Sequence, residues 1–185
     1  MSVKMKQEYK KKLTQALNEQ LNIEMYAAYF YLNCFQYCDR PDVNLPFVAK
    51  YFSEEYKKEF KHAENIIKYM NARELVVNFT RVEMPTFGFE SLHDVFAHAY
   101  EYEFLAWKHI SDISDLAAAN KDPSTVHIFD SLLDDQIKIE QKLKKILHDV
   151  HNCDLDPFKY SQLDKSLFRK MLKDEDLDYK LQGML

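Results

Sequence analysis

The chain has 185 residues, of which 46% are hydrophobic, and this fits one domain with a single packed core. Its formal net charge of −5 argues against a general nucleic-acid-binding protein, because such proteins carry an excess of basic residues. Only two glycines occur, fewer than tight β-hairpins usually need, so the composition favours an all-α fold.

The first residues, MSVKMKQEYKKKL, lack the apolar segment of a secretion signal. No run in the chain approaches the roughly 20 apolar residues of a membrane span. The three cysteines are an odd number without a disulfide-like spacing, which indicates a reducing compartment. Cys34 and Cys38 are interpreted as small core residues, because zinc sites more often separate two cysteines by two residues. We therefore expect a cytoplasmic protein with no membrane or nucleic-acid partner.

Long segments of the chain repeat apolar residues every three or four positions, as amphipathic helices do. They predict helices at about 9–38, 45–73, 91–120 and 124–151. The third begins at Ser91, where S-L-H-D resembles a capping box with Asp94 in the third helical position. A shorter apolar pattern at 160–173 predicts a fifth helix docked on the others.

The lengths of the connections predict the topology. Short turns join the first helix to the second and the third to the fourth, so each pair should be antiparallel. The connection at 74–90 is long enough to travel the length of a bundle. An up-down-down-up order with one long crossover is the ferritin-like four-helix bundle. We expect a single domain over 1–185, with the bundle at about 9–151 and a carboxy-terminal helix and tail at about 152–185.

Polar residues interrupt the apolar face of every predicted helix. They are Glu24, Glu55, Glu59, His62, Glu103 and Gln136. A carboxylate that faces a core is costly to ionise without a partner charge or a metal. A single one would be expected to pair with a lysine at the edge of the bundle. Polar residues on all four helices, at about the same height when each residue rises about 1.5 Å, favour one shared site instead.

This combination of side chains suits metal ions. Carboxylates bind hard cations, and one imidazole adds affinity for first-row transition metals. Three glutamates with a shared bridging position suit two metals, and a pair of Fe²⁺ ions can supply two electrons to O₂. Tyr31 lies two turns from Glu24 on the same face. It is interpreted either as a hydrogen-bond partner or electron donor at this site, or as a core-packing tyrosine.

A second Glu-x-x-His pair occurs at Glu90 and His93. Glu90 precedes the capping Ser91 and therefore lies outside the regular helix. We interpret this pair as a surface feature, because an isolated Glu-x-x-His occurs often by chance.

Several stretches resemble eukaryotic ferritin heavy chains. They are 21-LNIEMYAAYFYL-32, 39-DRPDVNLPFVAKYF-52, the E-x-x-H-A-E of 59–64 and 120-NKDP-123. The resemblance covers about residues 8–150 and implies a ferroxidase that stores iron in a shell of twenty-four subunits. It implies two iron ions per subunit, Fe²⁺ and O₂ as reactants, and self-association, with or without a second type of ferritin subunit.

The resemblance also implies a role for each site residue. Glu24 and His62 would bind the first iron, Glu59 would bridge, and Glu103 would bind the second. Gln136 matches a glutamine near the second iron when a one-residue gap is placed before the fourth helix, and Tyr31 matches a neighbouring tyrosine. The implied catalytic residues are Glu24, Tyr31, Glu59, His62, Glu103 and Gln136, and the implied metal ligands are the same residues without Tyr31.

The sequence departs from the family on the outer face of the second helix. Lys58 and Lys61 occupy places where the family has acidic residues that are thought to nucleate mineral, and Lys57 lies beside them. These lysines are interpreted as weakening nucleation, or alternatively as pairing with Glu54, Glu55 or Glu64 with little consequence. The pore region 125–130 also lacks the usual acids, although it offers His127 and Asp130, and the carboxy-terminal segment diverges.

Two other functions remain open. The chain could be a non-catalytic bundle that forms a shell or binds a partner and keeps a vestigial metal site. It could also be another di-iron oxidoreductase, such as a rubrerythrin-like peroxidase. The absence of a Cys-x-x-Cys motif argues against the peroxidase, and so does Ile139, three residues after Gln136, where a second Glu-x-x-His would be needed.

Overall fold

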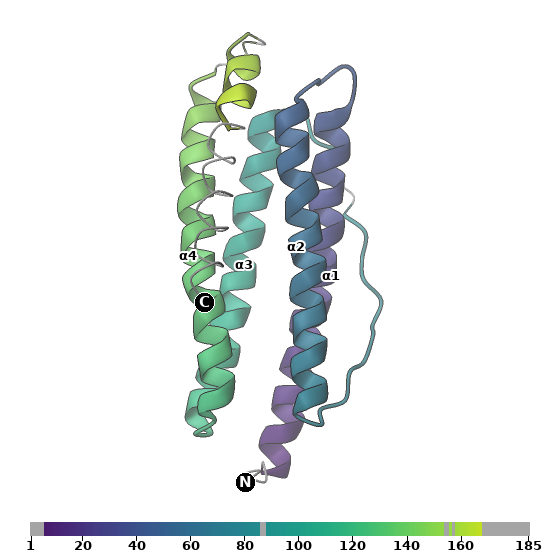
Figure 1. The fold of residues 1–185 in the computed structure, drawn as a ribbon, viewed down its shortest axis with the longest axis vertical. Coiled ribbons are helices and arrows are strands. Elements are labelled where there is room, and N and C mark those ends of the chain that lie inside the picture. The colour runs from purple at the N-terminus through teal and green to yellow at the C-terminus, as the bar shows by residue number, and fades with distance from the viewer. Residues whose placement is uncertain (1–5, 86–87, 154–155, 157, 168–185) are drawn as a thin grey trace, which may run out of the picture.

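A computed structural model describes residues 6–85, 88–153, 156 and 158–167. Its long helices are α1 (Gln7–Asp39), α2 (Pro46–Ala72), α3 (Leu92–Ala119) and α4 (Pro123–His151), shown in Figure 1. All the long helices expected from the sequence are present, with ends that differ by a few residues at most. The described chain also contains a helical segment at 158–167, and the remainder of the expected 160–173 helix lies outside the described residues. No helix in these ranges has the length and apolarity to cross a membrane.

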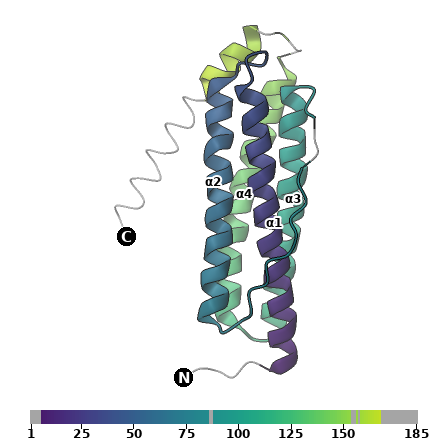
Figure 2. The same cartoon turned by 90° about the vertical axis from the view of Figure 1, so that its right-hand side faces the viewer.

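The topology is the predicted up-down-down-up order with a long crossover (Figure 1). The crossover between α2 and α3 runs along the bundle, as Figure 2 shows from the side. Asn18 of α1 holds it through both amide atoms, donating to the carbonyl oxygen of Val76 at 2.9 Å and accepting from the backbone N–H of Asn78 at 2.6 Å. Asn22 donates to the carbonyl oxygen of Arg81 at 3.1 Å. Side-chain amides on one face of α1 therefore satisfy backbone groups that the irregular segment leaves free.

The core consists of two apolar clusters separated by a polar layer. The upper cluster contains Phe30, Cys34, Cys38, Phe52, Phe96, Leu143 and Val150 among others. The lower cluster contains Leu13, Leu17, Met70, Ile113 and Phe129 among others. On each helix, the polar residues singled out from the sequence lie between the two clusters. Cys34 and Cys38 are free thiols buried in the upper cluster, which confirms that they are core residues.

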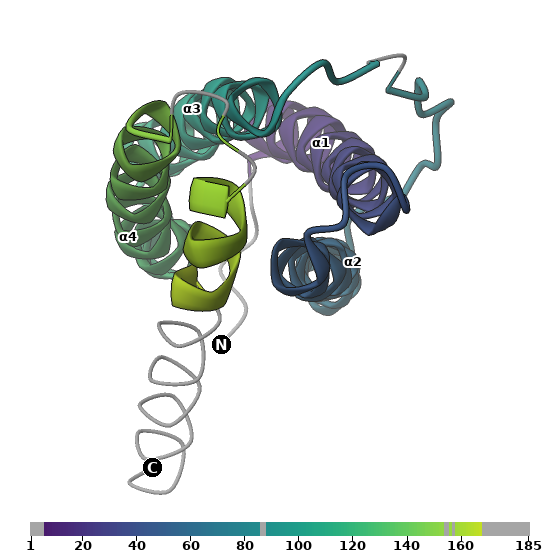
Figure 3. The same ribbon diagram turned by 90° about the horizontal axis from the view of Figure 1, so that it is seen from above.

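The bundle is less tightly closed on one side than the sequence pattern predicts. α1 packs against α2 and α3 against α4, while the two pairs meet through α1 and α3. Seen from above, α2 and α4 lie apart (Figure 3). Three residues near the middle of α4 that line the cavity between the helices, Leu132, Gln136 and Ile139, are accordingly only partly buried. An apolar stripe fixes which face of a helix turns inward, but it does not fix how closely the opposite helix approaches.

A cluster around Asp122 joins three helices at the lower end of the bundle. Asp122 is the N-cap of α4 and accepts from the backbone N–H of Thr125 at 3.3 Å. It also accepts from Tyr9 of α1 at 2.8 Å and from Arg73, the C-cap residue of α2, at 2.7 Å. Burial acts to raise the pKa of Asp122, but the Arg73 guanidinium and the hydroxyls outweigh it and lower the pKa to about 2.

At the upper end of the bundle, the segment 158–167 caps α2, although more than one hundred residues separate the two in the sequence. Asp164 Oδ1 accepts from the backbone N–H groups of Phe47 at 3.1 Å and Val48 at 2.8 Å, in the first turn of α2. The residue before that helix, Leu45, has no side chain able to cap it. The carboxylate of Asp164 therefore docks the carboxy-terminal segment on the bundle, as the apolar pattern at 160–173 predicts.

Replacing Asp122 with asparagine should destabilise the fold above pH 4. A pKa lowered from 3.8 to about 2 corresponds to about 2 kcal/mol of stability, which is present above pH 4 and is lost as the pH falls through 2. Urea-induced unfolding of the wild type and of Asp122→Asn, compared between pH 2 and pH 7, should show a difference that shrinks toward pH 2. The exposed Asp115→Asn is the matched control, and an equal effect of both substitutions at pH 7 would rule out this role for the cluster.

Candidate metal centre

Glu24, Glu59 and His62 form a compact group of potential ligands in the polar layer. One ligand atom from each lies within 4.8 Å of the others. Glu59 and His62 share a face of α2 because they are three residues apart, and His62 Nδ1 lies 3.2 Å from Glu59 Oε2. Glu24 comes from α1, and its Oε2 lies 3.5 Å from the same imidazole nitrogen. Both carboxylates are buried, while His62 is only partly covered.

The remaining predicted ligands approach from the other helix pair. Glu103 of α3 is buried and accepts a hydrogen bond from the Tyr31 hydroxyl. Gln136 of α4 has a buried Oε1 that meets no hydrogen-bond partner within the described ranges. A cavity of about 30 Å³ brings the two groups together. The five predicted ligands, Glu24, Glu59, His62, Glu103 and Gln136, all line it.

The buried carboxylates in this layer repel one another, and burial together with this repulsion shifts their pKa values. Burial raises the pKa of Glu59 well above its usual value, and the charges of Glu24 and Glu103 raise it further, although His62 partly offsets this. For Glu24, burial acts in the same direction, but hydrogen bonds from His62, Glu59 and Gln20 outweigh it, so its pKa is lowered. Burial also raises the pKa of Glu103 to about 7, despite the hydrogen bonds from Tyr31 and Gln136.

The imidazole carries the compensating charge. Burial lowers the pKa of His62, but the carboxylates of Glu24 and Glu59 outweigh burial and raise it to about 10. Without a bound cation the layer therefore keeps protons on His62 and Glu59. A divalent cation would supply the same positive charge and would displace those protons, because a ligating nitrogen or oxygen must give up its proton.

The donor atoms that line the cavity suit small divalent cations. Oxygen ligands with one imidazole nitrogen suit first-row transition metals such as Fe²⁺. The group of Glu24, Glu59 and His62 offers one position. Among the described residues, Gln136 Oε1 beside Glu103 has no hydrogen-bond partner, and a buried carbonyl oxygen in this state is costly unless a ligand satisfies it.

Tyr31 is both a hydrogen-bond partner of Glu103 and a core-packing tyrosine, and its role as an electron donor stays a prediction. Its hydroxyl donates to Glu103, and its ring stacks on Phe52 with centroids 5.9 Å apart. Burial, with the nearby charges of Glu103 and Glu59, raises the pKa of Tyr31 well above its usual value. The phenol therefore remains protonated and holds the Glu103 carboxylate as a hydrogen-bond donor.

The lysines of α2 form ion pairs away from the cavity. Lys57 Nζ lies 2.9 Å from Glu54, and Lys61 Nζ lies 2.8 Å from Glu64. Lys58 Nζ lies 2.9 Å from Glu55, so this buried glutamate is paired with a lysine and is not among the close group of ligands. The structure therefore contains the ion pairs of these lysines with Glu54, Glu55 and Glu64 that were considered from the sequence.

The other candidates from the sequence lie apart from the cavity. Glu90 and His93 are exposed, and Ser91 caps α3 as expected by accepting from the backbone N–H of Asp94 at 3.1 Å. His127 and Asp130 line a separate pocket at the start of α4.

Sequence reasoning missed two residues at the centre. Gln20 is fully buried, and its Nε2 donates to Glu24 Oε1 at 2.7 Å. Its position four residues before Glu24 is a signal that could have identified it, because such residues share a helix face. Tyr102 also lines the cavity, and its hydroxyl donates to the carbonyl oxygen of Ile23 at 2.6 Å.

The chain is similar in sequence to several known proteins. The family model described as the ferritin-like domain matches residues 14–152. The chain is 33% identical over 131 residues to a ferritin-2 heavy chain of Schistosoma mansoni, covering 70% of this chain and 76% of that protein. It is 26% identical over 161 residues to a ferritin of Pacifastacus leniusculus, covering 86% of each chain. It is 30% identical over 130 residues to a bacterial non-heme ferritin of Staphylococcus aureus (strain USA300), covering 70% of this chain and 77% of that protein.

Substituting Glu59 by glutamine should stabilise the metal-free protein. A carboxyl whose pKa is raised by folding destabilises the fold above its unfolded pKa, and glutamine mimics the protonated form. We expect the free energy of unfolding in guanidinium to rise by about 1–3 kcal/mol at pH 7, with the gain fading toward pH 4.5.

The same variant should lose most of the stabilisation that added Zn²⁺ gives to the wild type. Glu54→Gln, which alters an exposed ion pair on the same helix, is the control and should change neither quantity appreciably. A lower stability without metal, together with an undiminished response to Zn²⁺, would contradict the prediction.

Proposed function

Because this chain belongs to the ferritin family, we propose that it is an iron-storage subunit that binds Fe²⁺ within its own helical bundle and oxidises it with O₂. The observation that supports this proposal most directly is the small cavity in the polar layer. Ligand-type side chains from all four long helices line it, and no lysine or arginine is among its lining residues. A site that had lost its function would be free to lose ligands, and here every expected ligand type is retained.

We assign the residues of this cavity to two Fe²⁺ ions as substrate. Glu24 and His62 bind the first ion, and Glu103 with the oxygen of Gln136 binds the second. Glu59 bridges them. Each Fe²⁺ gives up one electron, and O₂ takes both electrons with two protons to give hydrogen peroxide and two Fe³⁺.

The protein's own groups prepare the site for this reaction. Entry of Fe²⁺ displaces the protons that Glu59 and His62 hold in the metal-free state, which makes binding tighter as the pH rises. Tyr31 orients Glu103 through its hydroxyl and is proposed as an electron donor in addition. The apolar clusters above and below exclude water from the carboxylates and strengthen their attraction for a cation.

We further propose that residues 1–185 act as a single domain that assembles into a twenty-four-subunit shell in the cytoplasm, as a homopolymer or with a second subunit type. The membership of the family supports this assembly. Ferric iron produced in the bundle would then be stored in the interior of the shell.

Removal of the α2 ligands should abolish rapid iron oxidation. Adding Fe²⁺ under air to the wild type should produce ferric absorbance quickly, while Glu59→Ala with His62→Ala should be slower by at least about tenfold. Glu90→Ala with His93→Ala is a matched control, because it removes the exposed Glu-x-x-His pair and should leave the rate unchanged. Equal rates for wild type and the α2 variant would favour the non-catalytic bundle.

The lysines of α2 should limit mineral formation and leave oxidation intact. Lys58 and Lys61 neutralise Glu55 and Glu64, so these carboxylates are less able to bind Fe³⁺. Lys58→Glu with Lys61→Glu should therefore increase the iron retained per shell at an unchanged initial oxidation rate. The exposed pair of Lys61 with Glu64 contributes about 1 kcal/mol or less. Glu55 is buried, so Lys58→Glu also takes the lysine away from a buried carboxylate, and urea-induced unfolding of the variant should be measured beside its iron retention. Unchanged retention and core size would count against the idea.

A further inference from the structure

A hydrogen-bonded chain connects α3 to the carboxylate of Glu24 through the interior of the bundle. His109 Nδ1 lies 2.6 Å from Gln20 Oε1. Gln20 Nε2 in turn donates to Glu24 Oε1 at 2.7 Å. Gln20 is fully buried, and the side chain of His109 is 22% exposed. Neither residue lines the cavity of the candidate centre, so both act on it only through Glu24.

The chemistry of the two contacts fixes the direction of this chain. A carbonyl oxygen only accepts, so His109 Nδ1 carries the hydrogen, and an amide nitrogen only donates, so Glu24 accepts. If the amide of Gln20 turned over, its oxygen would face the carboxylate of Glu24, and His109 would have to carry its proton on Nε2 to accept from the amide nitrogen. The carboxylate of Glu24 therefore sets the orientation of the amide, and the N–H of His109 Nδ1 adds a second hydrogen bond that stabilises the same orientation.

The contacts of Glu24 divide its two oxygens between different tasks. Oε1 is held by Gln20, while Oε2 lies on the side of His62, 3.5 Å from Nδ1. We propose that Gln20 and His109 are positioning residues that hold Glu24 as a ligand through Oε2 alone, an inference that rests on the proposed iron site. Hydrogen-bond partners behind a metal ligand typically raise metal affinity by fixing the ligand's orientation.

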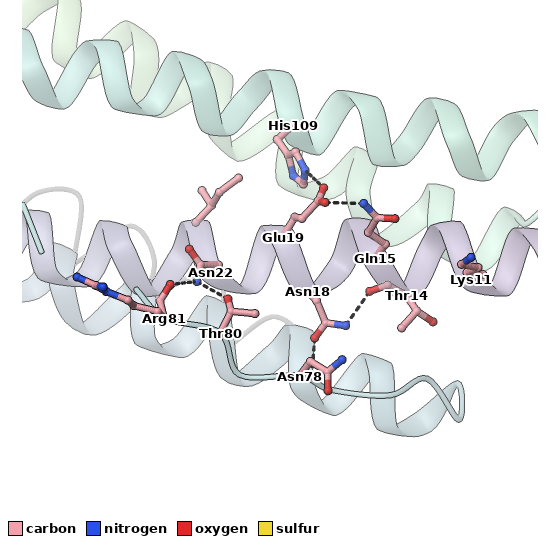
Figure 4. A pocket seen from close by; sticks show the side chains of 11 residues that line it. Lys11, Thr14, Gln15, Asn18, Glu19, Asn22, Asn78, Thr80, Arg81 and His109 are labelled. Atoms are coloured by element: carbon pink, nitrogen blue, oxygen red, sulfur yellow. Dashed lines mark hydrogen bonds and ion pairs between the residues drawn. The ribbon is translucent and has the colours of Figure 1, made fainter. Parts of the chain in front are cut away.

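The outer end of the chain reaches a groove on the surface of the protein. A groove of about 830 Å³ runs between α1, α3 and the crossover, and His109 forms part of its wall. Figure 4 shows His109 reaching from α3 toward Glu19 of α1, with Nε2 3.6 Å from Glu19 Oε2. Glu19 also accepts from Gln15 at 2.9 Å. His109 is partly open to solvent in this groove and does not line the cavity, so its substitution leaves every cavity residue unchanged.

Cobalt binding to the metal-free protein tests this inference without relying on oxidation. Co²⁺ gives a visible spectrum that reports ligand number and geometry, and titration gives its affinity. Gln20→Met keeps the length of the side chain but removes the donor, and it should weaken Co²⁺ binding by about 10–100-fold and alter the spectrum. His109→Phe should shift both in the same direction by a smaller factor, because Gln20 remains but its amide loses the second hydrogen bond that stabilises its orientation.

Two further variants distinguish positioning from packing. His109→Asn offers an amide donor near the place of Nδ1 and should restore the spectrum toward that of the wild type. Glu19→Gln alters only the outer contact and should leave affinity and spectrum unchanged. Wild-type affinity and spectrum in both Gln20→Met and His109→Phe would overturn the inference and leave the proposed function standing. Failure of the wild type to bind Co²⁺ would overturn both.

Discussion

The structure depends on the burial of three carboxylates in one narrow layer of a helical bundle. Glu24, Glu59 and Glu103 lie within the same cavity wall, away from bulk water. Like charges so placed repel one another, and each loses its hydration, so the layer retains protons until a cation arrives. The metal-free fold is consequently less stable than its apolar clusters alone would make it. A divalent cation bound in this layer would relieve both the repulsion and the lost hydration, which favours binding.

The rest of the bundle keeps this layer in register. Apolar clusters above and below fix the heights of the helices, and aspartates at both ends fix the helix termini. Asp122 joins α1, α2 and α4 at one end, while Asp164 holds the start of α2 at the other. The side between α2 and α4 is less closely packed, and Gln136 is only partly buried there. Gln136, which we assign to the second metal position, therefore lies on the less closely packed side.

The helical period separates charges that look contradictory in the sequence. Glu59 and His62 point into the bundle, whereas Lys57 and Lys61 project outward and pair with glutamates one turn away. A cluster of lysines therefore coexists with a candidate cation site on the same helix. Under the proposed function, oxidation inside the bundle and deposition on the outer face of α2 would be separable properties, each sensitive to a different set of residues.

The sequence by itself determined the helices, the crossover and the common height of the five predicted ligands. These follow from local rules, since a repeat of 3.6 residues sets the buried face and a rise per residue sets the height. The tertiary structure alone decided that His109 of α3 contacts Gln20, that Asp122 accepts from Tyr9 and Arg73, and that Asp164 caps α2. It also decided how far α4 stands from α2. The periodicity of a helix predicts which face a side chain lies on, but it does not predict which residue the side chain contacts. That partner belongs to another helix, whose distance and rotation are set by packing.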